Sequence, residues 1–319
     1  MSLIIRDLEA KKGEKVSGFI NIEDKNLKIP VTLINGQNEG KSILITAGIH
    51  GCEYLGIEVV NKLAKKIDPK KISGKIILVH VANISGFYSR VPAIVPEDGE
   101  NLNRVFPGDM NGSVSEKIAY TLTNEFQKKV DFYIDLHGGD LNEIVMPYVY
   151  YPGKGSDEVI KASCEVAKKL NVNYRVKSSA TTGAYNSAAI LGVPSVLIER
   201  GGAGLWNKKD VSEYEKDVYS VLAYYNIIEN SYLNEDIKQK EITNVIYVDS
   251  EFNGCWYPDV KPGEVIKKGQ VLGVIQDCFG KEINTYISQV NGVVLYMTVS
   301  LAIKKGNSLI AYGELSEEK

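Results

Sequence analysis

Four short apolar segments, separated by stretches with helical periodicity, constrain the fold of this chain more than any other feature. They cover residues 42–48, 75–81, 132–137 and 193–199. Each is rich in β-branched residues and bounded by turn residues, as expected of buried strands. Strands that alternate with helices predict an α/β sheet covered on both faces. Functional sites of such sheets lie at the carboxyl ends of the strands.

Two of the intervening segments carry clear helix signals. Apolar residues between positions 56 and 67 fall on one helical face, and the pattern stops at Asp68-Pro69. A second helix is predicted to begin at Ser113, because Ser113 and Glu116 have the spacing of a capping box.

The pattern changes near residue 235, where short β-rich pieces separated by glycine turns replace the helices. Asn253-Gly254 recurs as Asn291-Gly292, and the tetrapeptide Ile-Lys-Lys-Gly occurs at 266–269 and again at 303–306. We therefore predict two domains, residues 1–235 and 236–319, the second being a small all-β barrel of two equivalent halves. It resembles the hammerhead barrel of biotinyl and lipoyl domains. The hairpin at 277–281 departs from their attachment motif, so modification of Lys281 is not expected.

The bulk composition excludes several classes of function. The chain has 319 residues and a formal net charge of -3, so no broad positive field would attract nucleic acid. No run approaches the roughly 18 apolar residues that span a bilayer. The four cysteines are widely separated, which favours reduced thiols and a cytoplasmic location. Assembly of the chain into a homo-oligomer is compatible with the sequence.

Two of the three histidines stand at the end of a predicted strand, and each is followed at once by glycine. These are His50 and His137, and Glu53 follows His50 by three residues. Two imidazoles and one carboxylate are a zinc ligand set that leaves a position open for water or substrate, although iron, cobalt or nickel would also suit it. The sequence therefore predicts one metal ion, most simply Zn²⁺, at this edge of the sheet.

Three further side chains, Asp135, Cys52 and His80, receive other interpretations. Asp135 shares a strand face with His137 and could orient its imidazole. Cys52 is a rival ligand, but a packing role in the following helix is favoured. His80 lies inside an apolar strand, where a histidine satisfied by hydrogen bonds is the simpler interpretation.

Glu199 ends the fourth predicted strand and precedes a glycine-rich loop, which would bring a carboxylate to the same sheet edge as a general base. Asn103 and Arg104 lie side by side in a long loop between strands. An arginine fork and an amide suit a substrate carboxylate, whereas an ordinary ion pair is the alternative.

These motifs together resemble the succinylglutamate desuccinylase and aspartoacylase family, a branch of the zinc carboxypeptidase-like hydrolases. The matching pieces are Ala-Gly-Ile-His-Gly-Cys-Glu at 47–53, Asn-Leu-Asn-Arg-Val-Phe at 101–106, Asp-Leu-His at 135–137, and Glu199 with its glycine loop. The resemblance implies a mixed sheet with flanking helices and a C-terminal barrel beside the active-site entrance.

The resemblance also implies roles for individual residues. His50, Glu53 and His137 would bind one zinc ion, and Glu199 would act as general base and acid in hydrolysing an N-acyl amino acid. Asn103 and Arg104 would hold the substrate carboxylate. The family's carbonyl-polarising arginine would fall at Pro96, so Arg90 is the nearest candidate for that role.

Two alternative functions follow from the same residues. A metallocarboxypeptidase acting on peptides would use the same metal set and the same clamp. A non-catalytic, metal-dependent binding protein would need the ligands but not the base, so the presence of Glu199 argues against it.

Overall fold

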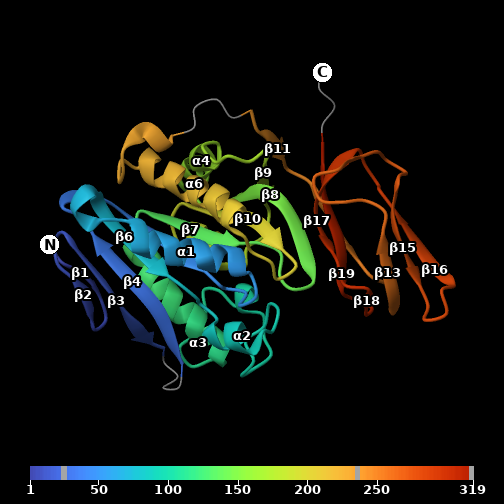
Figure 1. Ribbon diagram of the computed structural model, residues 1–319, viewed down its shortest axis with the longest axis horizontal. Coiled ribbons are helices and arrows are strands. Elements are labelled where there is room, and N and C mark those ends of the chain that lie inside the picture. Colours follow the sequence, from blue (N-terminus) through green and yellow to red (C-terminus); the bar gives the residue numbers. More distant parts are fainter. Residues whose placement is uncertain (23–26, 234–237, 316–319) are drawn as a thin grey trace.

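The computed structural model of the protein describes residues 1–22, 27–233 and 238–315, and a large mixed sheet with flanking helices dominates it (Figure 1). Thirteen strands belong to this sheet. Its main path runs in the order β12 (Val245–Asp249), β19 (Ser308–Glu314), β17 (Gly292–Thr298), β8 (Glu143–Pro152), β10 (Ser195–Gly202), β7 (Phe132–His137), β5 (Asn38–Ala47), β6 (Ser73–Val79), β4 (Lys28–Asn35) and β3 (Glu14–Asn21).

The remaining strands are short or form smaller sheets. Three belong to the large sheet outside its main path: β9 (Tyr174–Ser178), β11 (Lys240–Ile242) and β14 (Val265–Ile266). Two form a hairpin near the N-terminus: β1 (Leu3–Ile5) and β2 (Leu8–Ala10). Four form a separate C-terminal sheet: β13 (Gly254–Pro258), β15 (Val271–Gln276), β16 (Glu282–Ile287) and β18 (Ala302–Ile303).

The four strands expected from the sequence are β5, β6, β7 and β10, and they lie side by side in the order β6-β5-β7-β10. All three neighbouring pairs are parallel, which confirms the α/β prediction. The sheet is mixed because β4 and β8 run antiparallel to their neighbours β6 and β10. The carboxyl ends of the parallel strands therefore meet at one edge.

Helices cover both faces of this parallel centre. The α-helices are α1 (Tyr54–Lys66), α2 (Ile84–Ser89), α3 (Val114–Thr121), α4 (Asp157–Ala167), α5 (Ala184–Ile190) and α6 (Lys208–Tyr224). Shorter helical turns are η1 (Pro69–Lys71), η2 (Leu102–Arg104), η3 (Leu122–Phe126), η4 (Gln127–Lys129) and η5 (Asn230–Tyr232). One buried cluster joins α1, α4 and α6 to the sheet, and another joins α3 and α5 to it.

The two helix predictions are confirmed in detail. The apolar face of α1 is buried through Val59, Val60 and Leu63. Ser113 caps α3 by accepting a hydrogen bond from the Glu116 backbone N–H, and the Glu116 carboxylate accepts one from the Ser113 backbone N–H. This reciprocal capping box satisfies two donors that a helix start leaves unpaired.

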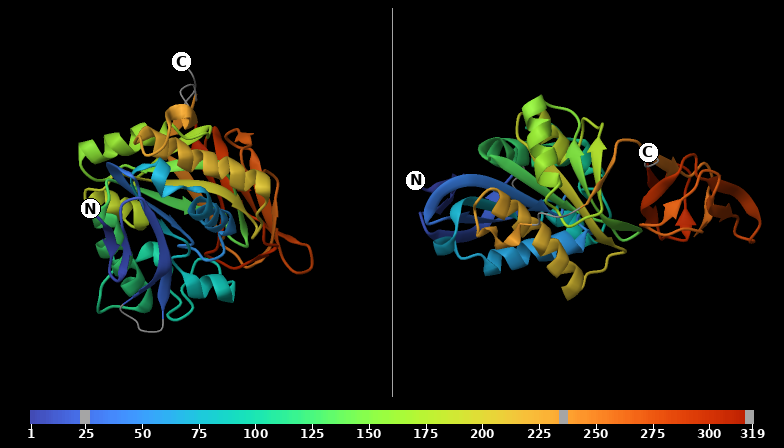
Figure 2. Two further views of the ribbon diagram at one scale, coloured as in Figure 1. Left: turned by 60° about the vertical axis from the view of Figure 1, so that its left-hand side comes forward. Right: turned by 90° about the horizontal axis from the view of Figure 1, so that it is seen from above.

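From residue 238 onward, every helix or strand that the structure describes is a strand, and Figure 2 shows this part beyond the helix-covered sheet. The expected boundary between residues 235 and 236 lies outside the described residues. Antiparallel pairing of β17 with β8 continues the large sheet into the C-terminal part. Residues of the C-terminal strands are thereby held next to the carboxyl edge of the central strands.

The internal repeat produces matching hydrogen bonds in the two halves of this part. The Asn291 side-chain oxygen accepts from the Lys268 backbone N–H at 3.0 Å, and that of Asn253 accepts from the Lys305 N–H at 2.8 Å. Each repeated asparagine thus anchors the Lys-Lys-Gly turn of the other half. The repeated motifs therefore make the same hydrogen bond in both halves.

None of the helices in the described ranges is long and apolar enough to cross a membrane.

Candidate metal centre and catalytic cavity

A tight turn between β5 and α1 presents His50 and Glu53 to the same point. Glu53 directly precedes α1, and its backbone N–H donates to the His50 carbonyl at 3.2 Å. Gly51 is required within this turn, because a Cβ there would lie 2.3 Å from the Phe87 backbone nitrogen. The glycine after His50 therefore allows the loop to pass close to α2.

His137 is the last residue of β7 and reaches the same point from the neighbouring strand. Glycine is also required at the next position, 138, because a Cβ there would lie 2.0 Å from the Arg200 carbonyl oxygen. Both histidine-glycine pairs thus stand where backbone segments approach closely at the sheet edge.

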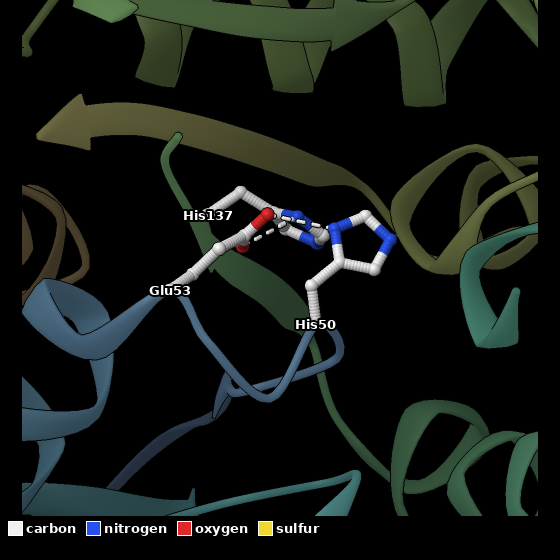
Figure 3. A group of neighbouring side chains, drawn as sticks. All are labelled: His50, Glu53 and His137. Carbon is white, nitrogen blue, oxygen red and sulfur yellow. Dashed lines mark hydrogen bonds and ion pairs between the residues drawn. The ribbon is translucent and has the colours of Figure 1, made fainter. Parts of the chain in front are cut away.

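The three side chains converge as the sequence predicts. Figure 3 shows the Glu53 carboxylate facing both imidazole rings. Its oxygens lie 2.7 Å from His50 Nδ1 and 3.0 Å from His137 Nδ1. One ligand atom from each of the three residues lies within 4.8 Å of the others, so the group could hold a metal ion.

The hydrogen bonding around this group fits a cation. Glu53 Oε2 is buried and has no partner with hydrogen-bond geometry, although His137 Nδ1 is close to it. Burial opposes the charge on Glu53, but the two histidines lower its pKa to about 2, so it is held as a carboxylate. A buried carboxylate oxygen without an aligned donor is costly. A cation between Glu53 and the Nδ1 atoms would satisfy it.

The outer nitrogens of both rings face polar partners. His50 Nε2 forms a 3.1 Å hydrogen bond with Asn101 Oδ1. His137 Nε2 lies 3.2 Å from Asp135 Oδ2, a charged contact without hydrogen-bond geometry. Asp135 is itself positioned by a 2.8 Å hydrogen bond from the Thr46 hydroxyl. Partners at Nε2 favour a proton on that nitrogen and leave the Nδ1 lone pair directed at the common centre. Asn101 was not identified from the sequence.

Glu199 lies beside this centre on β10, opposite His137 in the parallel register. Its Oε2 is buried without a hydrogen-bond partner. Burial raises its pKa to about 8, with smaller contributions from Glu53 and Asp135, although His137 acts in the opposite sense. A carboxyl group with a near-neutral pKa can both accept and return a proton at physiological pH.

Asn103 and Arg104 lie in η2 and line the same cavity. Asn103 is buried, and its Oδ1 accepts a 2.9 Å hydrogen bond from the Ala184 backbone N–H, which orients the side chain. Arg104 is exposed, and the one hydrogen bond of its side chain among the described residues is donated to the Asn103 carbonyl at 3.3 Å. Its guanidinium therefore keeps donors available to a ligand.

The structure places Arg90 and Cys52 differently from the other candidates. Arg90 is exposed at the end of α2 and is absent from the described residues that line the cavity. Cys52 is buried beside Tyr54, whose hydroxyl lies 3.8 Å from its sulfur, and it does not belong to the His-Glu-His group. His80 is satisfied by Thr32 and Asn61, each at 2.7 Å.

A cavity of about 680 Å³ connects the ligand group, Glu199 and η2. Its other walls could not be foreseen from local patterns. They include Asp140 and Glu143, the β9 residue Lys177, and the tyrosines Tyr148, Tyr150, Tyr185, Tyr247 and Tyr296. Tyr247 and Tyr296 come from the C-terminal strands β12 and β17. The only available signal was the high tyrosine content, 19 residues, which does not indicate location.

Fold and site together define an α/β protein with a candidate metal-binding group at the carboxyl edge of its central sheet. Residues 39–225 match the model of the succinylglutamate desuccinylase/aspartoacylase catalytic domain. The chain belongs to this family, as the sequence motifs indicated.

Individual relatives agree over nearly the whole length. The chain is 28% identical over 321 residues to the N-alpha-acetyl-L-2,4-diaminobutyric acid deacetylase of Halomonas elongata, covering 94% of this chain and 92% of that protein. The product-bound ectoine utilization protein EutE (DoeB) of Ruegeria pomeroyi superposes with a TM-score of 0.85 at 23% identity, covering 97% and 98% of the two chains. A succinylglutamate desuccinylase/aspartoacylase of Rhodobacter sphaeroides gives a TM-score of 0.83 at 20% identity, covering 95% and 96%.

Proposed function

We propose that this protein is a zinc-dependent amidohydrolase that removes the acyl group from an N-acyl amino acid. One observation carries the proposal: Glu199, whose Oε2 is buried without a hydrogen-bond partner, lines the same cavity as the His50, Glu53 and His137 group. A binding site would need the ligands alone, whereas hydrolysis also needs a base beside them.

In this proposal, His50, Glu53 and His137 hold the metal. A bound Zn²⁺ would polarise the substrate carbonyl and lower the pKa of a water molecule. Asn101, through a hydrogen bond, and Asp135, through a close charged contact, would orient the two imidazoles at their Nε2 atoms. Asn101 precedes η2 and Asp135 lies on β7, so segments distant from the β5–α1 turn would help to orient the ligands.

Glu199 would accept a proton from the attacking water and return it to the departing amine nitrogen. Its raised pKa suits both steps, because the carboxylate is a stronger base than an exposed one and the acid form is accessible near neutral pH. The reaction needs no covalent intermediate with the chain.

Arg104 and the Asn103 amide would hold the α-carboxylate of the substrate. Arg104 offers a planar fork of donors, and Asn103 is fixed by Ala184. Arg90, the candidate for polarising the carbonyl, lies at the surface end of α2 and is not among the described residues that line the cavity, so the proposal assigns this role to the metal.

The deacetylase activity named for the Halomonas relative supports an acetyl group as the acyl part. We further propose that the C-terminal strands form a hammerhead-like barrel of two halves. The exchanged hydrogen bonds of Asn253 and Asn291 support this arrangement.

A direct test is a screen of N-acetyl and N-succinyl amino acids against the zinc-loaded protein, following release of the primary amine. Dipeptides and longer peptides belong in the same screen. Hydrolysis of an N-acyl amino acid in preference to peptides is the expected result. Preference for peptides would point to a carboxypeptidase, and no hydrolysis of any compound would reject the enzymatic proposal.

A further inference from the structure

One carboxylate of the cavity, Glu143, has no part in the reaction described above. It is the first residue of β8, and its carbonyl oxygen accepts a 2.7 Å hydrogen bond from the Ala203 backbone N–H, which fixes the strand end. Its side chain lines the cavity and has no hydrogen-bond or ion-pair partner within the described ranges. A carboxylate in this position is available to a ligand.

The surroundings of Glu143 are strongly unfavourable for an isolated negative charge. Burial raises its pKa well above the ordinary value, and the nearby carboxylates Glu199, Asp140 and Glu53 raise it further. Asp140 is partly compensated, because its Oδ1 accepts a 2.6 Å hydrogen bond from the Asn142 backbone N–H. Glu143 lacks even this compensation. A cation bound beside it would relieve the repulsion and supply the missing donor.

Tyrosine side chains form the adjoining wall. Tyr148 and Tyr150 of β8 have ring centroids 5.1 Å apart, and the Tyr150 and Tyr247 hydroxyls lie 3.2 Å apart. The ring centroids of Tyr247 and Tyr296 lie 6.5 Å apart, and burial together with the nearby Glu143 charge raises the pKa of Tyr296. Tyrosine rings attract cations through their faces. The wall therefore favours the same charge as Glu143.

The cavity also carries cationic side chains. Arg104 reaches it from η2 and Lys177 from β9. Arg104 is the proposed partner of the substrate α-carboxylate, so the cavity offers recognition groups of both signs. An amino acid with a cationic side chain matches them, whereas an acidic side chain would meet the Glu143 carboxylate.

We propose that Glu143 is a specificity-determining residue that binds the protonated amino group of the substrate side chain, an inference that rests on the proposed function. The substrate class is then the Nα-acyl derivatives of basic amino acids. The wall of Tyr148, Tyr150, Tyr247 and Tyr296 encloses the apolar part of that side chain and the ammonium group.

The test uses three matched compounds with the zinc-loaded wild-type protein. They are Nα-acetyl-2,4-diaminobutyrate, its neutral counterpart N-acetylhomoserine, and N-acetylaspartate as the acidic member. A charge-assisted hydrogen bond discriminates by about 10- to 100-fold, so kcat/KM should be higher for the amine than for the alcohol by that factor. Equal or higher kcat/KM for the neutral or acidic compound would overturn the inference.

A variant tests whether Glu143 causes the preference for the amine. Glu143→Gln should bring the ratio of kcat/KM for amine and alcohol close to one, mainly through the KM of the amine. Glu251→Gln, an exposed glutamate of the C-terminal part, is the matched control and should keep the wild-type ratio. Loss of both activities by the same factor in Glu143→Gln would reject its role in specificity. The wild-type comparison needs no variant and stands if Glu143→Gln does not fold.

Calorimetry separates this inference from the proposed function. If none of the three compounds is hydrolysed, the deacylase proposal fails, but binding of 2,4-diaminobutyrate and homoserine can still be measured. Tighter binding of the diamino acid, lost in Glu143→Gln, would uphold the cation subsite. Equal binding, or no binding of either, would reject it.

Discussion

Glu199 of β10 and His137 of β7 are paired residues in the register of two adjacent parallel strands. Because side chains of paired residues point to the same face of a sheet, this single pairing sets the carboxylate beside the histidine. The location of Glu199 relative to the candidate metal group is thus a property of the rigid sheet and not of a loop.

The first prediction concerns metal content. His50→Ala and His137→Ala should each reduce bound zinc from about one per chain to a small fraction, because a two-ligand site binds much more weakly. Mass spectrometry of the metal content measures this. His80→Gln is the control, since His80 is bound to Thr32 and Asn61 and should not affect zinc. Unchanged zinc in both test variants would show that the ligands are wrongly assigned.

Glu199→Gln should keep the metal and the fold but lower kcat by about 100- to 10,000-fold, since glutamine cannot accept a proton. KM should change much less than kcat. Metal content and the melting temperature serve as controls. If a zinc-loaded variant retains more than about a tenth of wild-type kcat, another base acts. Asp140 would be the first to examine, because it lines the cavity, whereas Asp98 and Glu100 are not among the described residues that line it.

Arg104→Lys keeps the positive charge but loses the planar fork. Hydrolysis of a substrate with a free α-carboxylate should fall sharply, while that of the corresponding amide, already slow, should change little. The ratio of kcat/KM for the two substrates is the measured quantity. The same fractional loss on both would instead indicate that Arg104 supports the structure of η2.

Asp135→Asn should weaken zinc binding by about 10- to 100-fold, because the carboxylate that orients His137 becomes a neutral amide of the same size. Competition with a chelator of known affinity measures the dissociation constant. A purely structural Asp135 would show itself as a lower melting temperature with an unchanged zinc affinity.

A stability test away from the cavity uses Asp131. Burial alone would raise its pKa, but hydrogen bonds from Ser42 and the Lys41 ammonium outweigh burial and lower the pKa below the ordinary value. Stability from such a group is present above its unfolded-state pKa and is lost as pH falls through the folded-state pKa.

Asp131→Asn should therefore lower the free energy of unfolding at pH 7 by about 1 kcal/mol, a figure reduced for the exposed Lys41 partner. Urea unfolding from pH 7 down to about pH 3 measures the difference from wild type, which should shrink below about pH 4. A difference that is the same across this range would show that the charge of Asp131 contributes nothing.

Much of the architecture could be predicted because it depends on local patterns. The four buried strands and the capping box of α3 follow from residues close together in the chain. The candidate metal-binding group could also be predicted from the sequence. His50, Glu53 and His137 occur in short motifs at strand ends, and parallel strands bring those ends to one edge.

Other features depend on contacts between distant segments. Asn101 meets His50 across 51 residues of sequence, and Tyr150 meets Tyr247 across 97. Neither contact belongs to a local periodicity. The surface location of Arg90 likewise depends on how α2 ends and packs, and motif spacing carries no information about that.

The sequence by itself determined the four central strands, two of the helices, the internal repeat and the set of residues able to hold a metal, because each depends on spacings of a few residues. Only the tertiary structure decided which side chains surround that set. Antiparallel pairing of β17 with β8 brings Tyr296 to the cavity wall near Glu143. Such pairing depends on the register and burial of strands more than 140 residues apart, which no local pattern of residues encodes.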